Sequence, residues 1–149
     1  LEPDLAEALL DDRSPEVRER LATHTRDPEV MSALLADRTV RVRKGLALNQ
    51  RTTAEHRHAL ARDTAVDVRS ALVRAADLAE DDLRRLVHDR SAEVRRALAG
   101  STRTPAHIRR ELEDDPDETV AAEARRARQA PPARPARRGR NRFVTGPAR

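Results

Sequence analysis

Apolar residues recur along this chain with a period of about 26 residues. In each unit a Leu is followed three residues later by an Asp, and this Asp is followed five residues later by a Val. The aspartates are 25, 26, 26 and 26 residues apart. Self-similarity at a fixed period of this size is typical of repeat proteins. The leucines are Leu9, Leu34, Leu60, Leu86 and Leu112; the aspartates are Asp12, Asp37, Asp63, Asp89 and Asp115; the valines are Val17, Val42, Val68, Val94 and Val120.

The segment after each Asp has the spacing of a helix. In the fourth unit, Val94, Ala97, Leu98 and Ser101 lie at positions i, i+3, i+4 and i+7, so they share one helix face. The residue three positions before each Val occupies the N-cap, where a side-chain oxygen accepts a bond from a backbone N–H group. These residues are Ser14, Thr39, Ala65, Ser91 and Asp117. Because Ala has no such oxygen, the third unit should have the weakest cap.

A further helix is expected before each Asp. Asp27-Pro28 and Thr104-Pro105 mark two of its starts, since Pro is favoured in the first helical turn. Helices of two or three turns are marginal alone in water, so stacking of neighbouring units must stabilise them. The pattern therefore predicts an all-α solenoid of about five two-helix repeats over residues 1–128.

Two features predict how the units pack and where the stack ends. Gly45, Ala71 and Ala97 all lie eight residues after the Asp, where a small side chain lets adjacent helices approach closely. The last unit has Glu123 at this position and Arg125 shortly after it. Since a terminal repeat needs a polar outer face, this unit is expected to cap the solenoid.

The repeated motif D-x4-V-R-x2-L-A resembles that of the leucine-rich repeat variant (LRV) family. It occurs as DRSPEVRERLA, DRTVRVRKGLA, DTAVDVRSALV and DRSAEVRRALA, beginning at residues 12, 37, 63 and 89. The motif is also similar to HEAT repeats, whose units are longer. The resemblance implies a right-handed α-α superhelix, in which one helix of each pair is 3₁₀-like, that serves as a binding scaffold. A family member carries a Cys-ligated iron–sulfur cluster, which this chain cannot bind because it has no Cys.

Charge divides the chain into two parts. The net charge is +4, yet every Asp and Glu lies at or before Glu123. Residues 125–149 hold nine of the 30 Lys and Arg residues, which leaves 21 basic residues for the 26 acidic residues of the repeats. Such asymmetry is typical of a separate interaction tail.

The tail, residues 129–149, is expected to be disordered. Pro131, Pro132 and Pro135 disfavour helix and favour extended polyproline II. Its arginines would attract nucleic acid or another polyanion, whereas only Phe143 could stack on a base. The alternative is a solvated linker without a ligand. The candidate polyanion-binding residues are Arg134, Arg137, Arg138, Arg140 and Arg142.

Composition narrows the function classes. Without Cys, disulfides, thiolate metal sites and Cys nucleophiles are excluded. No apolar run approaches the roughly 18 residues that a membrane span needs, and no signal peptide is visible, so we expect a cytoplasmic protein. The 29 Arg against one Lys are typical of a GC-rich bacterial genome. The chain begins at Leu1 within the repeat pattern, as expected for a fragment of a longer protein.

One set of charged residues recurs in register and is a candidate site. Each Arg follows an Asp of its own unit by six residues. The arginines could face a ligand, or the two positions could form a structural ladder of charge-assisted hydrogen bonds, as the likeness to HEAT repeats implies. We favour the ladder. Its residues are Asp37, Arg43, Asp63, Arg69, Asp89 and Arg95.

The remaining titratable residues do not form a recognisable catalytic or metal motif. His56 and His58 are two residues apart and point to different helix faces, so we expect them to be exposed or half-buried. The acidic pairs, such as Asp81-Asp82, are expected on the solvated surface. Some HEAT-like folds act as DNA glycosylases, but base-handling sites rely on aromatics and this chain has neither Trp nor Tyr.

The sequence therefore predicts a protein that is not an enzyme and needs no cofactor or metal. The leading hypothesis is a protein-interaction scaffold with a charged solenoid surface, whose acidic bias favours a basic or mixed-charge protein partner. The alternative hypothesis is binding of nucleic acid or another polyanion through the Arg-rich tail. Neither hypothesis involves a membrane, and the oligomeric state is unknown.

Overall fold

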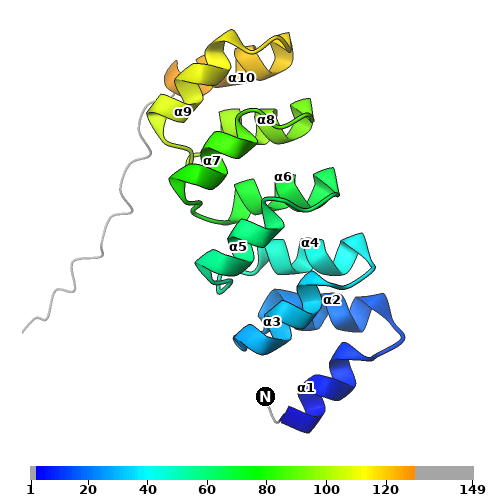
Figure 1. The fold of residues 1–149 in the computed structure, drawn as a ribbon. Coiled ribbons are helices and arrows are strands. Elements are labelled where there is room, and N and C mark those ends of the chain that lie inside the picture. Colours follow the sequence, from blue (N-terminus) through cyan, green and yellow to red (C-terminus); the bar gives the residue numbers. More distant parts are fainter. Residues whose placement is uncertain (1–2, 130–149) are drawn as a thin grey trace, which may run out of the picture.

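The computed structural model describes residues 3–129, and within that range it is entirely helical (Figure 1). The elements in chain order are α1 (Pro3–Leu10), α2 (Pro15–His24), α3 (Pro28–Leu35), α4 (Val40–Leu48), α5 (Ala54–Leu60), α6 (Val66–Ala75), α7 (Glu80–Leu86), α8 (Ala92–Gly100), α9 (Ala106–Glu111), the 3₁₀ helix η1 (Leu112–Asp114) and α10 (Glu118–Gln129). The predicted tail lies outside the described residues from residue 130 onward.

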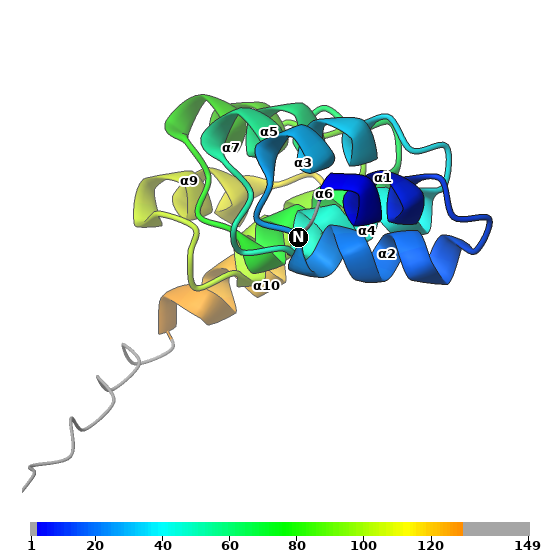
Figure 2. The same ribbon diagram turned by 90° about the horizontal axis from the view of Figure 1, so that it is seen from below.

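The helices form two layers. The first layer holds α1, α3, α5, α7 and α9, and the second layer holds α2, α4, α6, α8 and α10 (Figure 2). Successive second-layer helices pack closely on one another, whereas first-layer neighbours make fewer contacts. Units follow one another along a rod in sequence order (Figure 1). The predicted all-α solenoid of two-helix units is therefore confirmed.

The second-layer helices begin where the sequence places them, but their caps differ from the prediction. Ser14 and Asp117 accept bonds from the backbone N–H groups of Val17 and Val120, both at 3.4 Å. Thr39 and Ser91 are N-caps without such a bond. The Thr39 hydroxyl instead accepts a bond from Arg18 at 3.2 Å, so this cap side chain is used to join two units.

The first-layer helices agree with the predicted starts to within one residue. The Asp27 carboxylate accepts a bond from the Glu29 N–H at 2.9 Å and caps α3. In α9 the N-cap is Pro105 rather than Thr104, because Pro105 keeps an extended backbone with ψ at 150°. Among the described residues, 3₁₀ geometry is confined to η1, so the 3₁₀-like helix implied for every unit is not present here.

The core is a thin seam of aliphatic side chains between the layers. Val42, Val68, Val94 and Val120 are all fully buried, in agreement with the repeated register. Gly45 shows why a small residue is needed between α2 and α4. A Cβ at this position would lie 3.1 Å from the Glu19 backbone oxygen, closer than ordinary van der Waals contact. A larger side chain would therefore force the two helices apart.

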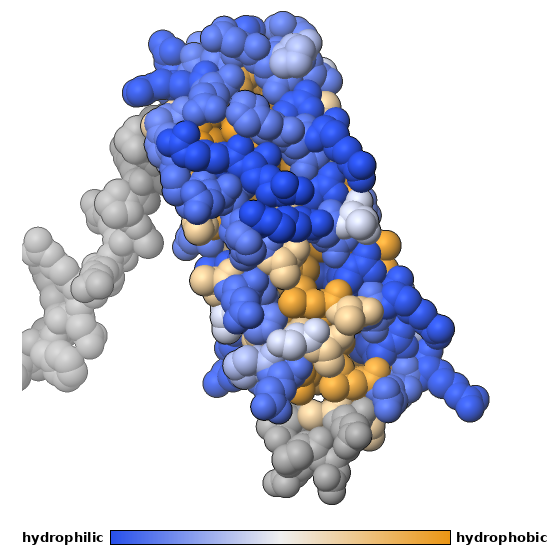
Figure 3. Space-filling view, in the orientation of Figure 1, coloured by the Kyte–Doolittle hydropathy of each residue, from blue (hydrophilic) through white to orange (hydrophobic). Residues whose placement is uncertain are grey.

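The C-terminal unit presents a polar outer surface. Val120, Ala121 and Ala124 of α10 are buried. On its other side, Thr119 and Arg126 are exposed. This arrangement fits the predicted cap, because a terminal helix must bury one face against its neighbour and solvate the other. The opposite end of the rod is more apolar: Leu5 of α1 is 50% exposed, and apolar atoms gather at this end in Figure 3.

Candidate functional site

The Asp and Arg positions singled out in the sequence form a continuous ladder along the edge where first-layer helices turn into second-layer helices. We define the ladder as the four arginines and the four aspartates that they bind. Each Arg extends its guanidinium group toward the Asp of the next unit, about 20 residues further along the chain. The ladder pairs are Arg18–Asp37, Arg43–Asp63, Arg69–Asp89 and Arg95–Asp115, each with an Nε–Oδ2 distance of 2.7 Å.

Each ladder Arg joins three parts of the chain. In the third unit, Arg69 donates from Nε and Nη2 to the two carboxylate oxygens of Asp89, at 2.7 and 2.9 Å. Its Nη1 donates to the backbone carbonyl oxygen of Asp63 in its own unit, at 2.6 Å. Asp89 also accepts a bond from the Ser91 N–H at 2.8 Å. The six-residue spacing in the sequence thus reflects a bond to the Asp backbone, while the carboxylate partner belongs to the next unit.

Hydrogen bonds from Arg side chains and backbone N–H groups hold the pKa values of the ladder residues Asp89 and Asp115 below their usual range. The Arg69 and Asp89 side chains are only 5% and 8% exposed. Burial alone would raise the pKa of Asp89, but the bonds from Arg69 and the Ser91 N–H outweigh it and hold that pKa below its usual value. For Asp115 the bond from Arg95 is the largest influence and lowers the pKa. The ladder arginines therefore face carboxylates inside the edge, where they hold successive units together.

Two polar residues of the first layer are more buried than the sequence indicates. His56 is 4% exposed, with its ring nitrogens 2.6 Å from the Thr53 hydroxyl and 3.1 Å from the Ser32 hydroxyl. The expectation of an exposed or half-buried His56 is therefore wrong, because two hydroxyl partners satisfy the ring inside the layer.

Asp82 is the second such residue. It is 2% exposed, although its acidic pair was expected on the surface. Its Oδ1 accepts a bond from Arg62 at 2.7 Å and lies 2.9 Å from His58 Nδ1. These contacts join α5 to α7. No three His, Asp or Glu side chains gather into a metal-binding set anywhere in residues 3–129.

The outer surface of the second layer carries charges of both signs. Arg41 of α4 lies between Glu16 and Glu19 of α2, 2.7 Å from the first of them. On the other side of α4, Lys44 approaches Asp67 of α6 at 3.8 Å. These side chains are mostly exposed, in contrast to the ladder pairs. The second layer is therefore a mixed-charge surface rather than a basic or an acidic one.

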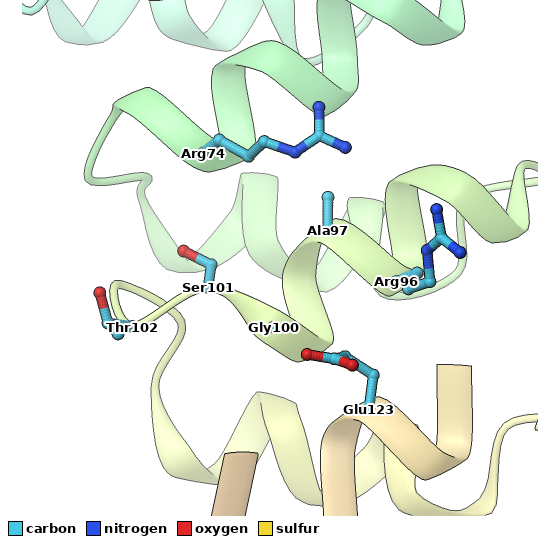
Figure 4. Close-up of a pocket in the computed structure, with 7 residues that line it drawn as sticks. All are labelled: Arg74, Arg96, Ala97, Gly100, Ser101, Thr102 and Glu123. Carbon is cyan, nitrogen blue, oxygen red and sulfur yellow. The ribbon is translucent and has the colours of Figure 1, made fainter. Parts of the chain in front are cut away.

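A groove interrupts this surface between α6, α8 and α10. Its volume is about 540 Å³. The lining residues, which define the second-layer groove, are Arg74, Arg96, Ala97, Gly100, Ser101, Thr102 and Glu123 (Figure 4). Ala97 and Gly100 leave the bottom of the groove open because their side chains are small or absent. Arg74 extends its guanidinium group over Ala97, Arg96 lies beside Ala97, and Glu123 of α10 extends toward Gly100 (Figure 4).

The positive charges of Arg74 and Arg96 are only weakly compensated by neighbouring carboxylates of the described residues. Arg74 is 3.9 Å from Glu93, at the limit of an ion pair, and donates a long bond of 3.3 Å to the Ser70 hydroxyl. Arg96 has no ion pair with any residue of the described range 3–129. Two guanidinium groups beside a low floor can bind a carboxylate or another planar anion.

Alignment of the repeated units predicts only some of the groove residues. The small residue at Ala97 and the unusual Glu123 both stand out when the units are aligned. Arg74 and Arg96 do not, because each position is basic in only one other unit, at Arg126 and Lys44 respectively. The candidate tail residues, from Arg134 to Arg142, lie outside the described residues.

The fold and its surface define a helical-repeat solenoid with a mixed-charge groove. None of the helices within residues 3–129 is both long and apolar enough to cross a bilayer. No protein-family model, no curated protein and no solved structure matches the chain.

Proposed function

We propose that this chain is a non-enzymatic protein-interaction scaffold that binds its partner in the second-layer groove. The observation that carries the proposal is the pair Arg74 and Arg96, which line a groove of about 540 Å³ and have no close ion pair within residues 3–129. A partner carboxylate placed between them would gain charge-assisted hydrogen bonds. The motif's likeness to the LRV family supports the same proposal, since that family consists of binding scaffolds.

The charge of the groove indicates the kind of partner. Glu123 lies opposite the two arginines, so a segment with an acidic side chain near Arg96 and a basic one near Glu123 would complement both. Of the basic and mixed-charge partners expected from the sequence, the groove favours the mixed-charge one. Electrostatic complementarity of this sort mainly determines specificity and the rate of association.

The proposal is tested by charge reversal. Native-host lysate is passed over the immobilised wild-type chain, over R74E/R96E, and over R38E/R110E. The control has the same change in net charge at exposed arginines outside the groove, neither of which forms an internal bond in the described range. A partner that binds the wild type and the control but not R74E/R96E supports the proposal. Partners retained equally by all three would contradict it.

The tail gives an alternative proposal, which is polyanion binding through Arg134, Arg137, Arg138, Arg140 and Arg142. It is supported by the run of arginines without any acid. Such binding should weaken steeply as salt rises, because it releases counterions from the polyanion. Deletion of residues 130–149 should abolish binding to duplex DNA or RNA, and binding that survives the deletion would contradict this alternative.

A further inference from the structure

A second hollow lies on a different surface, at the edge where α5 turns into α6 and α7 turns into α8 (Figure 1). Its volume is about 340 Å³. The residues that line it, which define the turn hollow, are Arg62, Asp63, Thr64, Arg69, Arg85, His88, Asp89 and Arg90. Four arginines and a histidine thus surround a small space that contains two carboxylates.

The two carboxylates of the turn hollow belong to the ladder and are already neutralised. Asp63 receives two bonds from Arg43, at 2.7 and 3.1 Å. Asp89 receives its two bonds from Arg69. Arg62 is likewise occupied, because it binds the buried Asp82.

The other two arginines of the turn hollow are not occupied in this way. Arg85 and Arg90 are exposed, and neither forms an ion pair or a side-chain hydrogen bond with any residue of the described range 3–129. The Thr64 hydroxyl and the His88 ring add further polar groups to the same wall. The hollow therefore has an uncompensated positive charge and several hydrogen-bond donors.

The net positive charge of the turn hollow is not repeated at the first two units, where the matching hollow has three arginines and three aspartates. The position of Arg62 and His88, directly before the ladder Asp, holds Asp11 in the first unit and Asp114 in the last. The position of Arg85 holds Glu111 in the last unit. A nucleic-acid backbone needs a basic track that continues over several phosphates. An isolated hollow bounded by acidic units suits a single compact anion instead.

We propose that the turn hollow binds a phosphomonoester, carried on a phosphorylated Ser or Thr side chain of a protein partner. Such a group has a charge of about −1.5 to −2 at pH 7 and three acceptor oxygens, and guanidinium groups are well suited to bind it. Arg85 and Arg90 would supply the main bonds, with Thr64 and His88 beside them. The site is independent of the second-layer groove, so either proposal can fail without the other.

The test compares peptides by isothermal titration calorimetry. One peptide has a phosphoserine among Gly and Ala residues, and its twin has an unmodified Ser. The wild-type chain should bind only the phosphorylated peptide. R85Q/R90Q should bind it about a hundredfold more weakly, roughly tenfold for each charged donor removed. Because both side chains are exposed and make no internal bonds, Tm should be unchanged.

The matched control is R38Q/R84Q. Arg38 occupies the position of Arg90 in another unit, and Arg84 precedes Arg85 on α7, yet neither lines the hollow. This variant should bind the phosphopeptide as the wild type does. Equal weakening in both variants would show a general effect of net charge and overturn the proposal. So would the absence of phosphopeptide binding, or tighter binding of a short DNA duplex that R85Q/R90Q abolishes.

Discussion

The ladder and the second-layer surface use the same residue types in different ways. Both join neighbouring units through Arg and carboxylate side chains, but Arg69 is 5% exposed in the ladder whereas Arg41 is 53% exposed on the surface. In the ladder each guanidinium also bonds to backbone, so its position is fixed on several sides. Exposed pairs lose most of their energy to solvation and side-chain entropy. The difference indicates that the ladder pairs stabilise the stack of units, whereas the charged side chains of the second-layer surface remain available to partners.

The largest expected effect is the loss of a ladder residue from the middle of the rod. In Arg69→Ala, Asp89 would remain largely buried without its cationic partner, and a backbone carbonyl of the preceding turn would lose its donor. We expect the free energy of unfolding to fall by about 2 to 4 kcal/mol, slightly below the full cost of breaking a deeply buried pair. Chemical denaturation followed by circular dichroism measures it.

Arg38→Ala is the matched control for this measurement. Arg38 is exposed at the same edge and makes no internal bond in residues 3–129, so its loss should leave the midpoint nearly unchanged. If both variants unfold at the same denaturant concentration, the ladder does not hold the units together and the comparison fails.

The sequence predicts the ladder residues but not all of their bonds. The period places an Asp and an Arg in every unit, yet only the stacking of units shows that Arg43 binds Asp63 rather than the carboxylate of Asp37. The spacing within one unit cannot show which Asp is bound, because the distance between units depends on how closely the helices approach at residues such as Gly45. The groove is not predicted for a related reason: the positions of Arg74 and Arg96 are basic in only one other unit each, so the period does not mark them.

Acid should weaken the stack through the ladder carboxylates. The pKa values of Asp37, Asp89 and Asp115 are lowered in the folded chain. A lowered folded pKa adds stability above the unfolded value of about 3.9, and this is lost as pH falls through the folded pKa. Thermal unfolding between pH 7 and pH 2 should therefore show a decline that begins below about pH 5.

Asp89→Asn isolates one contribution to this decline. The variant cannot titrate at residue 89, so its stability should depend less steeply on pH than that of the wild type, although it starts from a lower value at pH 7. Parallel curves for the two proteins would mean that Asp89 does not contribute to the acid response.

A smaller effect is expected on the second-layer surface. Arg41→Gln removes the cation between Glu16 and Glu19, but all three side chains reach solvent. We expect Tm to change by less than about 2 °C, and this small change to vanish at high salt because exposed pairs are screened. The ladder variant should keep its deficit at the same salt concentration. A surface variant as unstable as Arg69→Ala would remove the distinction between the two regions.

The smallest effect on stability should accompany the largest effect on binding. In R74E/R96E the two groove arginines become acidic, but neither loses a short ion pair within residues 3–129: Arg74 is 3.9 Å from Glu93, and Arg96 is exposed and unpaired there. Surface substitutions of this kind usually change the free energy of unfolding by no more than about 0.5 kcal/mol. Calorimetric unfolding should therefore superimpose on that of the wild type while partner capture is lost. A marked fall in Tm would instead place these arginines with the ladder, as part of what holds α6, α8 and α10 together.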